Sequence, residues 1–220
     1  MNIILLGLPG AGKGTHARKL NEKYGIIHLS SGQVIRKVAR QNSSIGVVVK
    51  RYIHQGKLVP DEIAVKLMRE RLLKLKGQDT ILDGFPRNLE QVKFLEGILD
   101  EIDEKIDVCF YLKVKKEILL ERLAGRKICL NDGSIYHEKW NPPREENKCD
   151  QCGAKLFQRE YDKENLINKR IEVDQKDLKK VKDYYENKDL LKIIEGSDKN
   201  IKEVQMEIEK TINDLGGIES

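Results

Sequence analysis

Residues 7–15 read Gly-Leu-Pro-Gly-Ala-Gly-Lys-Gly-Thr, and this short stretch decides the fold. The apolar run 2–6 in front of it is typical of a buried parallel strand, and a helical pattern through Leu20 and Tyr24 follows it. Glycines at a turn from strand to helix let successive backbone N–H groups point inward around a phosphate group, and the helix N-terminus adds partial positive charge. The stretch therefore predicts a phosphate-binding loop at the end of the first strand.

Two side chains of this loop, Lys13 and Thr15, carry the chemistry expected there. Lysine can reach the outer phosphates of a nucleotide, and a hydroxyl can bind Mg²⁺. In the usual pattern Ser or Thr directly follows the lysine, whereas here Gly14 follows Lys13 and Thr15 comes one residue later. The alternative is a glycine-rich turn with a chance lysine, but the strand before the loop and the helix after it favour phosphate binding.

Four further apolar runs, at residues 26–29, 80–83, 108–112 and 190–194, read as strands, and helical segments lie between them. Within 61–76, for example, the apolar residues recur at helical spacing. Strands that alternate with helices form βαβ units, so we expect an α/β fold in which helices flank a parallel sheet.

Two stretches interrupt this alternation. Residues 30–59 are polar and mostly helical, while residues 128–162 hold three of the four cysteines and the only tryptophan and read as a small ribbon. We therefore expect one core that carries two inserts. This core consists of residues 1–29, 60–127 and 163–220.

The composition fits one globular domain. The chain has 220 residues, with 41 Lys+Arg against 36 Asp+Glu, and its formal net charge of +5 is spread along the sequence. No apolar run approaches the roughly 18 residues that a membrane span needs, and the N-terminus lacks the basic segment of a signal peptide. We therefore expect a cytoplasmic monomer with no membrane partner. We also expect no nucleic-acid partner, because this charge excess is too small to indicate nucleic-acid binding.

A second phosphate-transfer signature, Asp83-Gly84-Phe85-Pro86-Arg87, ends the run 80–83. Ligands of open parallel sheets bind beyond the carboxyl ends of the strands, so Asp83 is expected near Lys13, where its carboxylate could hold Mg²⁺ through water. Gly84 allows close approach of the backbone, and Arg87 can grip a phosphate with two hydrogen bonds. A helix cap at Asp83 and a surface ion pair at Arg87 are the simpler alternatives, but neither explains why both residues follow one strand.

Together these motifs resemble adenylate kinase, in order and spacing, over nearly the whole chain. The residues that carry the resemblance are 7–15, Ser30-Ser31-Gly32, Lys57-Leu58-Val59-Pro60-Asp61, Asp83–Arg87, Gln91 and Arg122-Leu123-Ala124-Gly125-Arg126. The resemblance implies a P-loop NTPase-type fold, with 30–59 as the AMP-binding insert and 128–162 as the long lid of that family. It also implies the reversible, Mg²⁺-dependent reaction ATP + AMP = 2 ADP.

The resemblance further implies two nucleotide sites. For ATP, the phosphate contacts would come from Gly10, Ala11, Gly12, Lys13, Gly14, Thr15 and Arg126. Arg122 would stack on the adenine, Ile135 and Tyr136 would flank the nucleotide, and Gly196 and the backbone near Asp198 would close the adenine pocket. For AMP, the contacts would come from Ser31, Arg36, Lys57, Leu58, Val59, Gly84, Phe85, Pro86, Arg87 and Gln91, with Gln91 at the adenine edge. Arg159 and Arg170 would clamp the transferring phosphate, so the implied catalytic set is Lys13, Arg87, Arg126, Arg159 and Arg170.

The sequence departs from the family pattern at a few positions. The usual Ser-Thr-Gly-Asp is Ser30-Ser31-Gly32-Gln33 here, so Ser31 lacks a methyl group and an acid near the metal is replaced by Gln33. Tyr161 stands where the lid usually has a carboxylate, and the segment that ends in Asp198 differs by one residue in length.

The inserted ribbon contains a metal-binding pattern. Cys129-x₂-Asp132 is followed by Cys149-x₂-Cys152, and ligands two residues apart can present both side chains to one tetrahedral Zn²⁺ ion. His137 is the rival fourth ligand, and a metal-free ribbon is the alternative. Four protein ligands leave no open position, so we expect a structural ion.

Cys109 and Trp140 are expected to have packing roles only. Cys109 lies in an apolar strand and is expected to be a core thiol, and Trp140 is expected to pack within the ribbon.

Other functions stay open from the sequence alone. A kinase for another nucleoside monophosphate, or one that uses GTP as donor, would share most of these motifs, although Gln91 and the long lid favour adenine nucleotides. A P-loop protein whose zinc ribbon binds nucleic acid or a partner would need a basic ribbon rich in aromatic residues. The ribbon segment 144–148 is instead mixed in sign.

Overall fold

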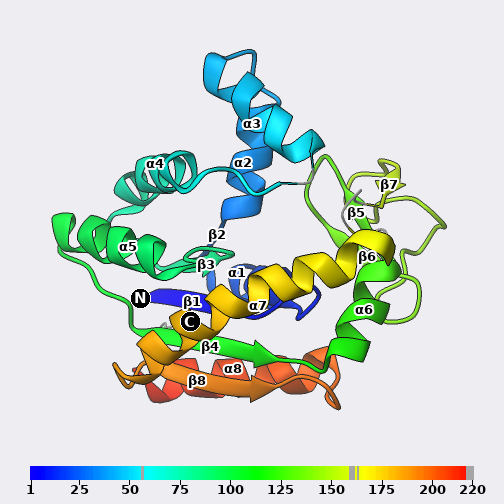
Figure 1. The fold of residues 1–220 in the computed structure, drawn as a ribbon. Coiled ribbons are helices and arrows are strands. Elements are labelled where there is room, and N and C mark those ends of the chain that lie inside the picture. Colours follow the sequence, from blue (N-terminus) through cyan, green and yellow to red (C-terminus); the bar gives the residue numbers. More distant parts are fainter. Residues whose placement is uncertain (56, 159–161, 163, 217–220) are drawn as a thin grey trace.

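The computed structural model describes residues 1–55, 57–158, 162 and 164–216; for residues 164–167, 169 and 170 it describes the backbone alone. Its centre is a five-stranded sheet in the order β2-β3-β1-β4-β8, with all neighbouring strands parallel (Figure 1). The strands are β1 (Asn2–Leu6), β2 (Ile27–Ser30), β3 (Thr80–Asp83), β4 (Val108–Lys113) and β8 (Leu191–Glu195).

The predicted α/β class is confirmed. All five apolar runs form strands, and the runs 2–6 and 80–83 coincide with β1 and β3. The other three strands end one residue later than predicted, at polar residues whose backbone still pairs with the neighbouring strand: Ser30, Lys113 and Glu195. The predicted helix 61–76 is α4 (Asp61–Leu72) followed by a 3₁₀ turn, Leu73–Leu75.

Helices cover both faces of the sheet (Figure 1). Side chains alternate along a strand, so Ile3 and Leu5 of β1 face one cluster of buried residues and Ile4 and Leu6 face the other. The first cluster includes side chains of α1 (Lys13–Tyr24), α6 (Lys116–Ala124) and α8 (Ile201–Asp214). The second includes side chains of α4, α5 (Leu89–Glu101) and α7 (Glu164–Glu186). Among the helices described, none has the length and apolar character that crossing a membrane requires.

Two small units extend from this core (Figure 1). Helices α2 (Ser31–Ala39) and α3 (Ser44–His54) pack together and against α4 through Val38, Val49 and Leu67. An antiparallel ribbon forms from β5 (Arg126–Cys129), β6 (Ile135–His137) and β7 (Leu156–Phe157), in the order β6-β5-β7. Its first strand starts two residues before the predicted boundary at 128.

Helix α7 contributes two adjacent tyrosines to the packing beneath the sheet. The Tyr184 hydroxyl donates to the Glu96 carboxylate, at 2.7 and 2.6 Å from its two oxygens. The Tyr185 side chain is fully buried, and its hydroxyl has no hydrogen-bond partner among the described residues. An unpartnered buried hydroxyl costs the free energy of its lost hydration.

We predict that Tyr185→Phe raises the free energy of unfolding by about 1–2 kcal/mol, because the change removes that cost and keeps the ring. Tyr184→Phe is the matched control and should lower the free energy of unfolding, since it removes a hydrogen bond to a carboxylate. Urea unfolding followed by circular dichroism measures both. A Tyr185→Phe protein clearly less stable than the parent would mean that the hydroxyl has a partner in solution.

Candidate active site

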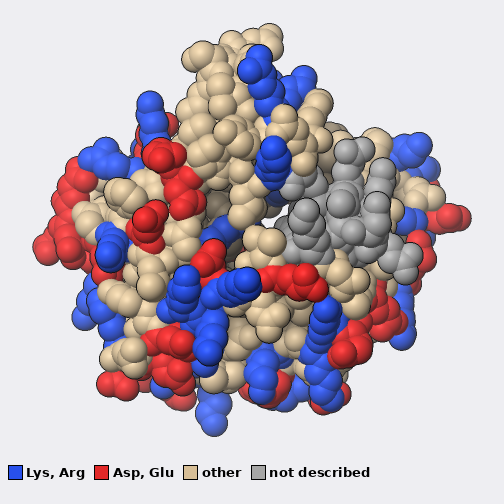
Figure 2. Space-filling model, in the orientation of Figure 1, with Lys and Arg blue, Asp and Glu red and all other residues tan. Residues whose placement is uncertain are grey.

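A cavity of about 1550 Å³ lies where the strands of the sheet end. It is bounded by the phosphate loop, the end of β3, the α2–α3 unit, the ribbon and the segment before α8. Figure 2 shows this side of the molecule hollowed below the α2–α3 unit. The location agrees with the rule that ligands of parallel sheets bind beyond the carboxyl ends of the strands.

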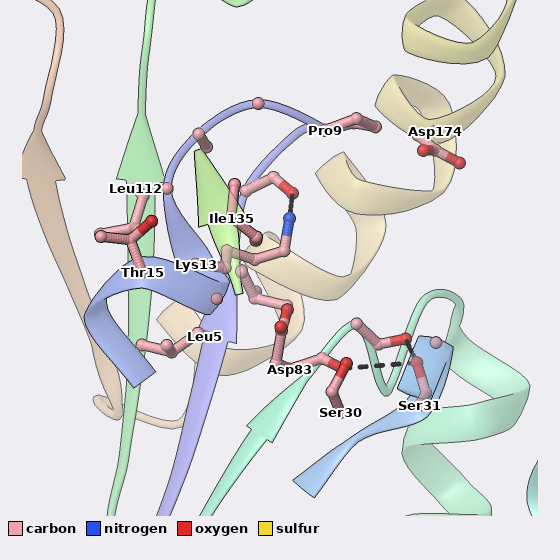
Figure 3. A pocket seen from close by; sticks show the side chains of 18 of the residues that line it. Leu5, Pro9, Lys13, Thr15, Ser30, Ser31, Asp83, Leu112, Ile135 and Asp174 are labelled. Carbon is pink, nitrogen blue, oxygen red and sulfur yellow. Dashed lines mark hydrogen bonds between the residues drawn. The ribbon is translucent and has the colours of Figure 1, made fainter. Parts of the chain in front are cut away.

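The phosphate loop has the backbone conformation that its glycines predict. Gly10 and Gly12 adopt φ of 87° and 99°, a region that residues with a side chain rarely adopt. Gly12 is the N-cap of α1, so the helix N-terminus points toward the cavity. The Lys13 ammonium donates to the carbonyl oxygens of Gly7 (2.6 Å) and Leu8 (3.2 Å), so it lies over the loop (Figure 3).

Asp83 ends β3 beside this loop (Figure 3). One of its carboxylate oxygens lies 3.2 Å from His28 Nε2. Burial alone would raise the pKa of Asp83, but the hydrogen bond from His28 and the positive charges of Lys13 and Arg87 outweigh it and lower the pKa. The carboxylate is therefore ionised at neutral pH. Together with the Thr15 hydroxyl on the same cavity wall, it offers the hard oxygen ligands that suit Mg²⁺.

The loop that follows β3 is held by hydrogen bonds to its own backbone. The Ser31 hydroxyl donates to the Gly84 carbonyl at 2.6 Å, and Arg87 Nε donates to the same oxygen at 2.9 Å. The Gln91 amide joins this loop to α4, because its oxygen accepts from the Arg87 N–H (2.8 Å) and its nitrogen donates to Asp61 (2.6 Å). The predicted adenine-reading amide thus also fixes the loop that carries Arg87.

Five arginines of the described part of the chain line the cavity: Arg18, Arg36, Arg87, Arg122 and Arg126. Arg122 donates to the Gly196 carbonyl at 3.2 Å, and Arg126 makes two hydrogen bonds with Asp162, at 2.8 and 2.7 Å. Arg159 and Tyr161 lie outside the described residues, and Arg170 is described by its backbone alone.

The remaining predicted nucleotide contacts also line this cavity, and two of them, Tyr136 and Asp198, have side chains that are held by the protein itself. The Tyr136 ring is buried in the ribbon, where its hydroxyl accepts from the Asp150 N–H at 2.8 Å. The Asp198 carboxylate is 82% exposed and pairs with Lys115 at 3.3 Å. The other residues of this set are Gly10, Ala11, Gly14, Ile135, Lys57, Leu58, Val59, Phe85, Pro86 and Gly196.

Trp140 and His16 are among the cavity residues that were not predicted as site residues from the sequence. Trp140 packs within the ribbon as predicted, with its ring centre 4.3 Å from that of His137. It also lies on the cavity wall, with its ring centre 5.6 Å from the Arg122 guanidinium. His16 follows Thr15 and is buried in the cavity floor. Burial lowers the pKa of His16; a hydrogen bond to Gln205 opposes this shift, while the charges of Lys19 and Arg122 add to it. The sequence places His16 directly after the P-loop, and this position could have marked it as a cavity residue. Only the fold, however, brings His16 to Gln205 and Trp140 to Arg122.

The four predicted metal ligands form one cluster in the ribbon. The ligand atoms of Cys129, Asp132, Cys149 and Cys152 all lie within 4.8 Å of one another. The Ser134 N–H donates to Asp132 at 2.7 Å and so orients its carboxylate. His137, the rival ligand, hydrogen-bonds instead to the backbone of Glu121 and Lys139. Three thiols and one carboxylate suit a tetrahedral Zn²⁺ ion.

Each half of this cluster is built by the same turn. The Gly133 N–H donates to the Cys129 carbonyl at 3.1 Å, and the Gly153 N–H donates to the Cys149 carbonyl at 2.8 Å. Both glycines have positive φ, 78° and 69°. Gly133 also contacts the core, since its carbonyl accepts from Arg18 at 3.0 Å. The loop that holds Asp132 therefore rests on α1.

The fold and the site define a class: a phosphate-binding-loop protein whose parallel sheet carries a nucleotide-sized cavity at its carboxyl edge. A family model described as adenylate kinase matches residues 5–190. The chain is similar to adenylate kinases of Geobacillus sp. (strain WCH70), at 43% identity over 100% of both chains, and of Bacillus licheniformis, at 44% identity over 99% of both. It is 39% identical to that of Clostridium perfringens over 90% of this chain and 92% of the relative. The chain belongs to the adenylate kinase family.

We predict that Gly84→Ala lowers the free energy of unfolding by at least about 1–2 kcal/mol, the cost of placing a side chain at positive φ. Gly84 has φ of 75°, and an added Cβ would lie 2.9 Å from the Ser31 hydroxyl. Gly97→Ala is the matched control. Gly97 lies in α5 with nothing within 4 Å of an added Cβ, so alanine should stabilise the protein by roughly 0.5–1 kcal/mol. Thermal unfolding of both variants tests this prediction. If Gly84→Ala and Gly97→Ala unfolded at the same midpoint temperature, the assignment of strain to Gly84 would be contradicted.

Proposed function

We propose that this protein catalyses the reversible, Mg²⁺-dependent transfer of a phosphoryl group from ATP to AMP, which yields two ADP. The observation that carries the proposal is that one cavity connects the Lys13 loop with a second cationic region around Arg36 and Arg87. Membership of the adenylate kinase family supports the same reaction. An assay of ADP formation across donor and acceptor nucleotides tests it: turnover should be fastest with ATP and AMP, and a clear preference for another pair would contradict it.

The chemistry needs cations and positioning. An oxygen of the AMP phosphate attacks the γ-phosphorus of ATP while the bond to the β–γ bridging oxygen breaks. The attacking phosphate is already an anion at neutral pH, so no general base is required. Lys13, Arg87 and Arg126 stabilise the charge that spreads over the transferring group. Thr15, and Asp83 through water, would hold Mg²⁺, which when bound neutralises charge on the ATP phosphates.

In this proposal the two nucleotides occupy opposite ends of the cavity. ATP lies on residues 10–15 with its base near Arg122, and AMP lies against Ser31, Arg36, the 57–59 backbone and the 84–91 region. Arg159 and Arg170 complete the clamp on the transferring phosphate. The core, the AMP insert (30–59) and the lid (128–162) are the corresponding domains. Since one chain supplies both ends of the cavity, we propose a monomer, and the free thiols fit a reducing cytoplasm.

The alternatives receive less support. GTP as donor, or another monophosphate as acceptor, would need a different polar pattern around the bases, and the nucleotide assay distinguishes these cases. Nucleic-acid binding would need a basic surface. On the face drawn in Figure 2, basic and acidic residues are intermixed, and in the ribbon Lys127 and Lys148 pair with Glu138 and Glu145.

We also propose that the ribbon cluster holds one structural Zn²⁺ ion. Within the described part of the ribbon the buried apolar cluster has four residues, and two of them are candidate metal ligands: Cys129, Tyr136, Cys149 and Leu156. A unit of this size cannot bury enough apolar surface to fold alone. Metal binding would supply the missing stability, because its free energy becomes folding free energy.

We predict that Lys13→Ala lowers turnover by about 10²–10³ fold, since its charge acts on the phosphates where negative charge develops. Lys93→Ala, an exposed change on α5, is the control and should retain full turnover. Circular dichroism should find both variants folded. Near-normal turnover of a folded Lys13→Ala protein would exclude this loop as the site of transfer.

We predict that Gln91→Leu raises the KM for AMP on the order of ten-fold, because adenine and the Arg87 loop both lose an amide partner. The KM for ATP, measured in the same assay, is the internal control and should change little. If instead the KM for ATP rose while that for AMP stayed constant, the two nucleotide sites would be exchanged.

We predict that the purified protein carries about one zinc per chain, as one closed four-ligand site requires. Chelation should lower the thermal midpoint and leave substantial turnover at low temperature. Asp132→Cys should keep or tighten zinc binding, since a thiolate is the softer ligand, and Asp132→Ala should weaken it. Cys109→Ala is the matched control and should keep the zinc. Loss of all activity on zinc removal, with the ribbon still folded, would make the ion catalytic.

A further inference from the structure

A chain of polar side chains links α1 to α8 beneath the cavity. His16 Nδ1 lies 2.9 Å from Gln205 Oε1, Gln205 Nε2 donates to Glu209 at 2.9 Å, and the Lys23 ammonium donates to Glu209 at 2.5 Å. His16 is 3% exposed and Gln205 7% exposed. The chain therefore runs from the surface at Lys23 to the cavity floor.

This chain fixes where the His16 ring carries its hydrogen. The Glu209 carboxylate, which Lys23 keeps ionised, can only accept. The Gln205 amide must therefore direct its nitrogen toward Glu209 and its oxygen toward His16. An amide oxygen only accepts, so His16 Nδ1 must donate to it, and in the neutral ring Nε2 is left as an acceptor.

The Nε2 side of the ring faces the phosphate loop at the donor end of the cavity. A Cβ added to Gly12 would lie 3.4 Å from His16 Cδ2 and 3.5 Å from Nε2. Both residues line the cavity, together with Arg122, Trp140 and Gly196. Among the described residues, Nε2 has no hydrogen-bond partner in the protein. Since Nε2 is not among the fully buried unpartnered atoms of the described residues, this acceptor is reachable from the cavity, where a donor on the ligand can meet it.

We propose that His16 is a specificity-determining residue, whose Nε2 accepts a hydrogen bond from the nucleoside part of the phosphoryl donor. Two groups of ATP supply this chemistry: a ribose hydroxyl and the amino group of adenine. A keto oxygen on the base, as in guanine, would instead place an acceptor against an acceptor. The inference rests on the proposed function, because it takes ATP as the ligand of this end of the cavity.

The first experiment compares His16→Leu, which replaces the ring with an apolar side chain of similar size, with His16→Gln, whose amide oxygen can accept. His16→Leu should raise the KM for ATP on the order of ten-fold and leave the KM for AMP within about two-fold, the usual range for one lost hydrogen bond in a buried site. His16→Gln should recover part of the loss. An unchanged KM for ATP, or an equal rise for ATP and AMP, would overturn the proposal.

Nucleotide analogues identify the partner. The parent protein and His16→Leu are assayed with 2′-deoxy-ATP, 3′-deoxy-ATP and the purine triphosphate that lacks the 6-amino group. The analogue that lacks the partner of His16 should be penalised with the parent but not further penalised with His16→Leu. If every analogue suffers the same loss with both proteins, His16 contacts none of these groups and the proposal fails. ADP formation by the parent with ATP and AMP keeps this failure separate from a failure of the proposed function.

Nitrogen NMR spectroscopy measures the tautomer of the His16 ring directly. In ¹⁵N-labelled protein the His16 nitrogens should have the shifts of the Nδ1–H tautomer, and a non-hydrolysable ATP analogue should move the Nε2 signal more than the Nδ1 signal. Gln205→Met removes the amide that fixes the tautomer and should give mixed shifts. An Nε2–H tautomer in the parent protein, or an Nε2 signal that does not shift when the ATP analogue is added, would overturn the inference.

Discussion

The carboxyl ends of five parallel strands meet at one edge of the sheet, and the position of the candidate reacting groups depends on that geometry. β1 pairs with β3 and β4, so the phosphate loop that follows it leaves from the middle of the edge. The register pairs Leu5 with Asp83 and Asp83 with Ser30, which brings the ends of three strands to one level. Lys13, Asp83 and Ser31 therefore come together although 70 residues separate the first two.

Most of this arrangement could be predicted from the sequence, because short-range patterns determine it. The glycines of 7–15 and the five apolar runs define the strands and the loop without reference to any distant residue. The errors in the predicted strand ends arise where hydrogen bonding between distant segments determines where a strand ends. Strand ends at Ser30 and Glu195 are polar, so the apolar pattern stops before the hydrogen bonds do.

The side-chain positions that the sequence did not predict also depend on contacts between segments that lie apart in the chain or on the pairing of strands. Ile135 and Tyr136 both line the cavity, but side chains alternate along β6, so the Tyr136 ring turns into the ribbon. Trp140 reaches the cavity because the ribbon folds back toward α6, where Arg122 lies 18 residues earlier in the chain. The hydrogen-bond partner of His16, Gln205, comes from the distant helix α8. No local pattern contains this information.

The four thiols of the chain differ sharply in their access to water. Cys152 is exposed, Cys129 and Cys149 are buried in the ribbon, and Cys109 lies in β4 with no exposed surface, where burial raises the pKa of its thiol well above the usual value. A thiol-directed label must therefore react in a fixed order. Cys152 is reachable in the folded protein, Cys129 and Cys149 become reachable when the ribbon opens, and Cys109 only when β4 leaves the sheet. Counting labelled thiols by mass would thus separate the opening of the ribbon from unfolding of the core, within one chain and at its own cysteines.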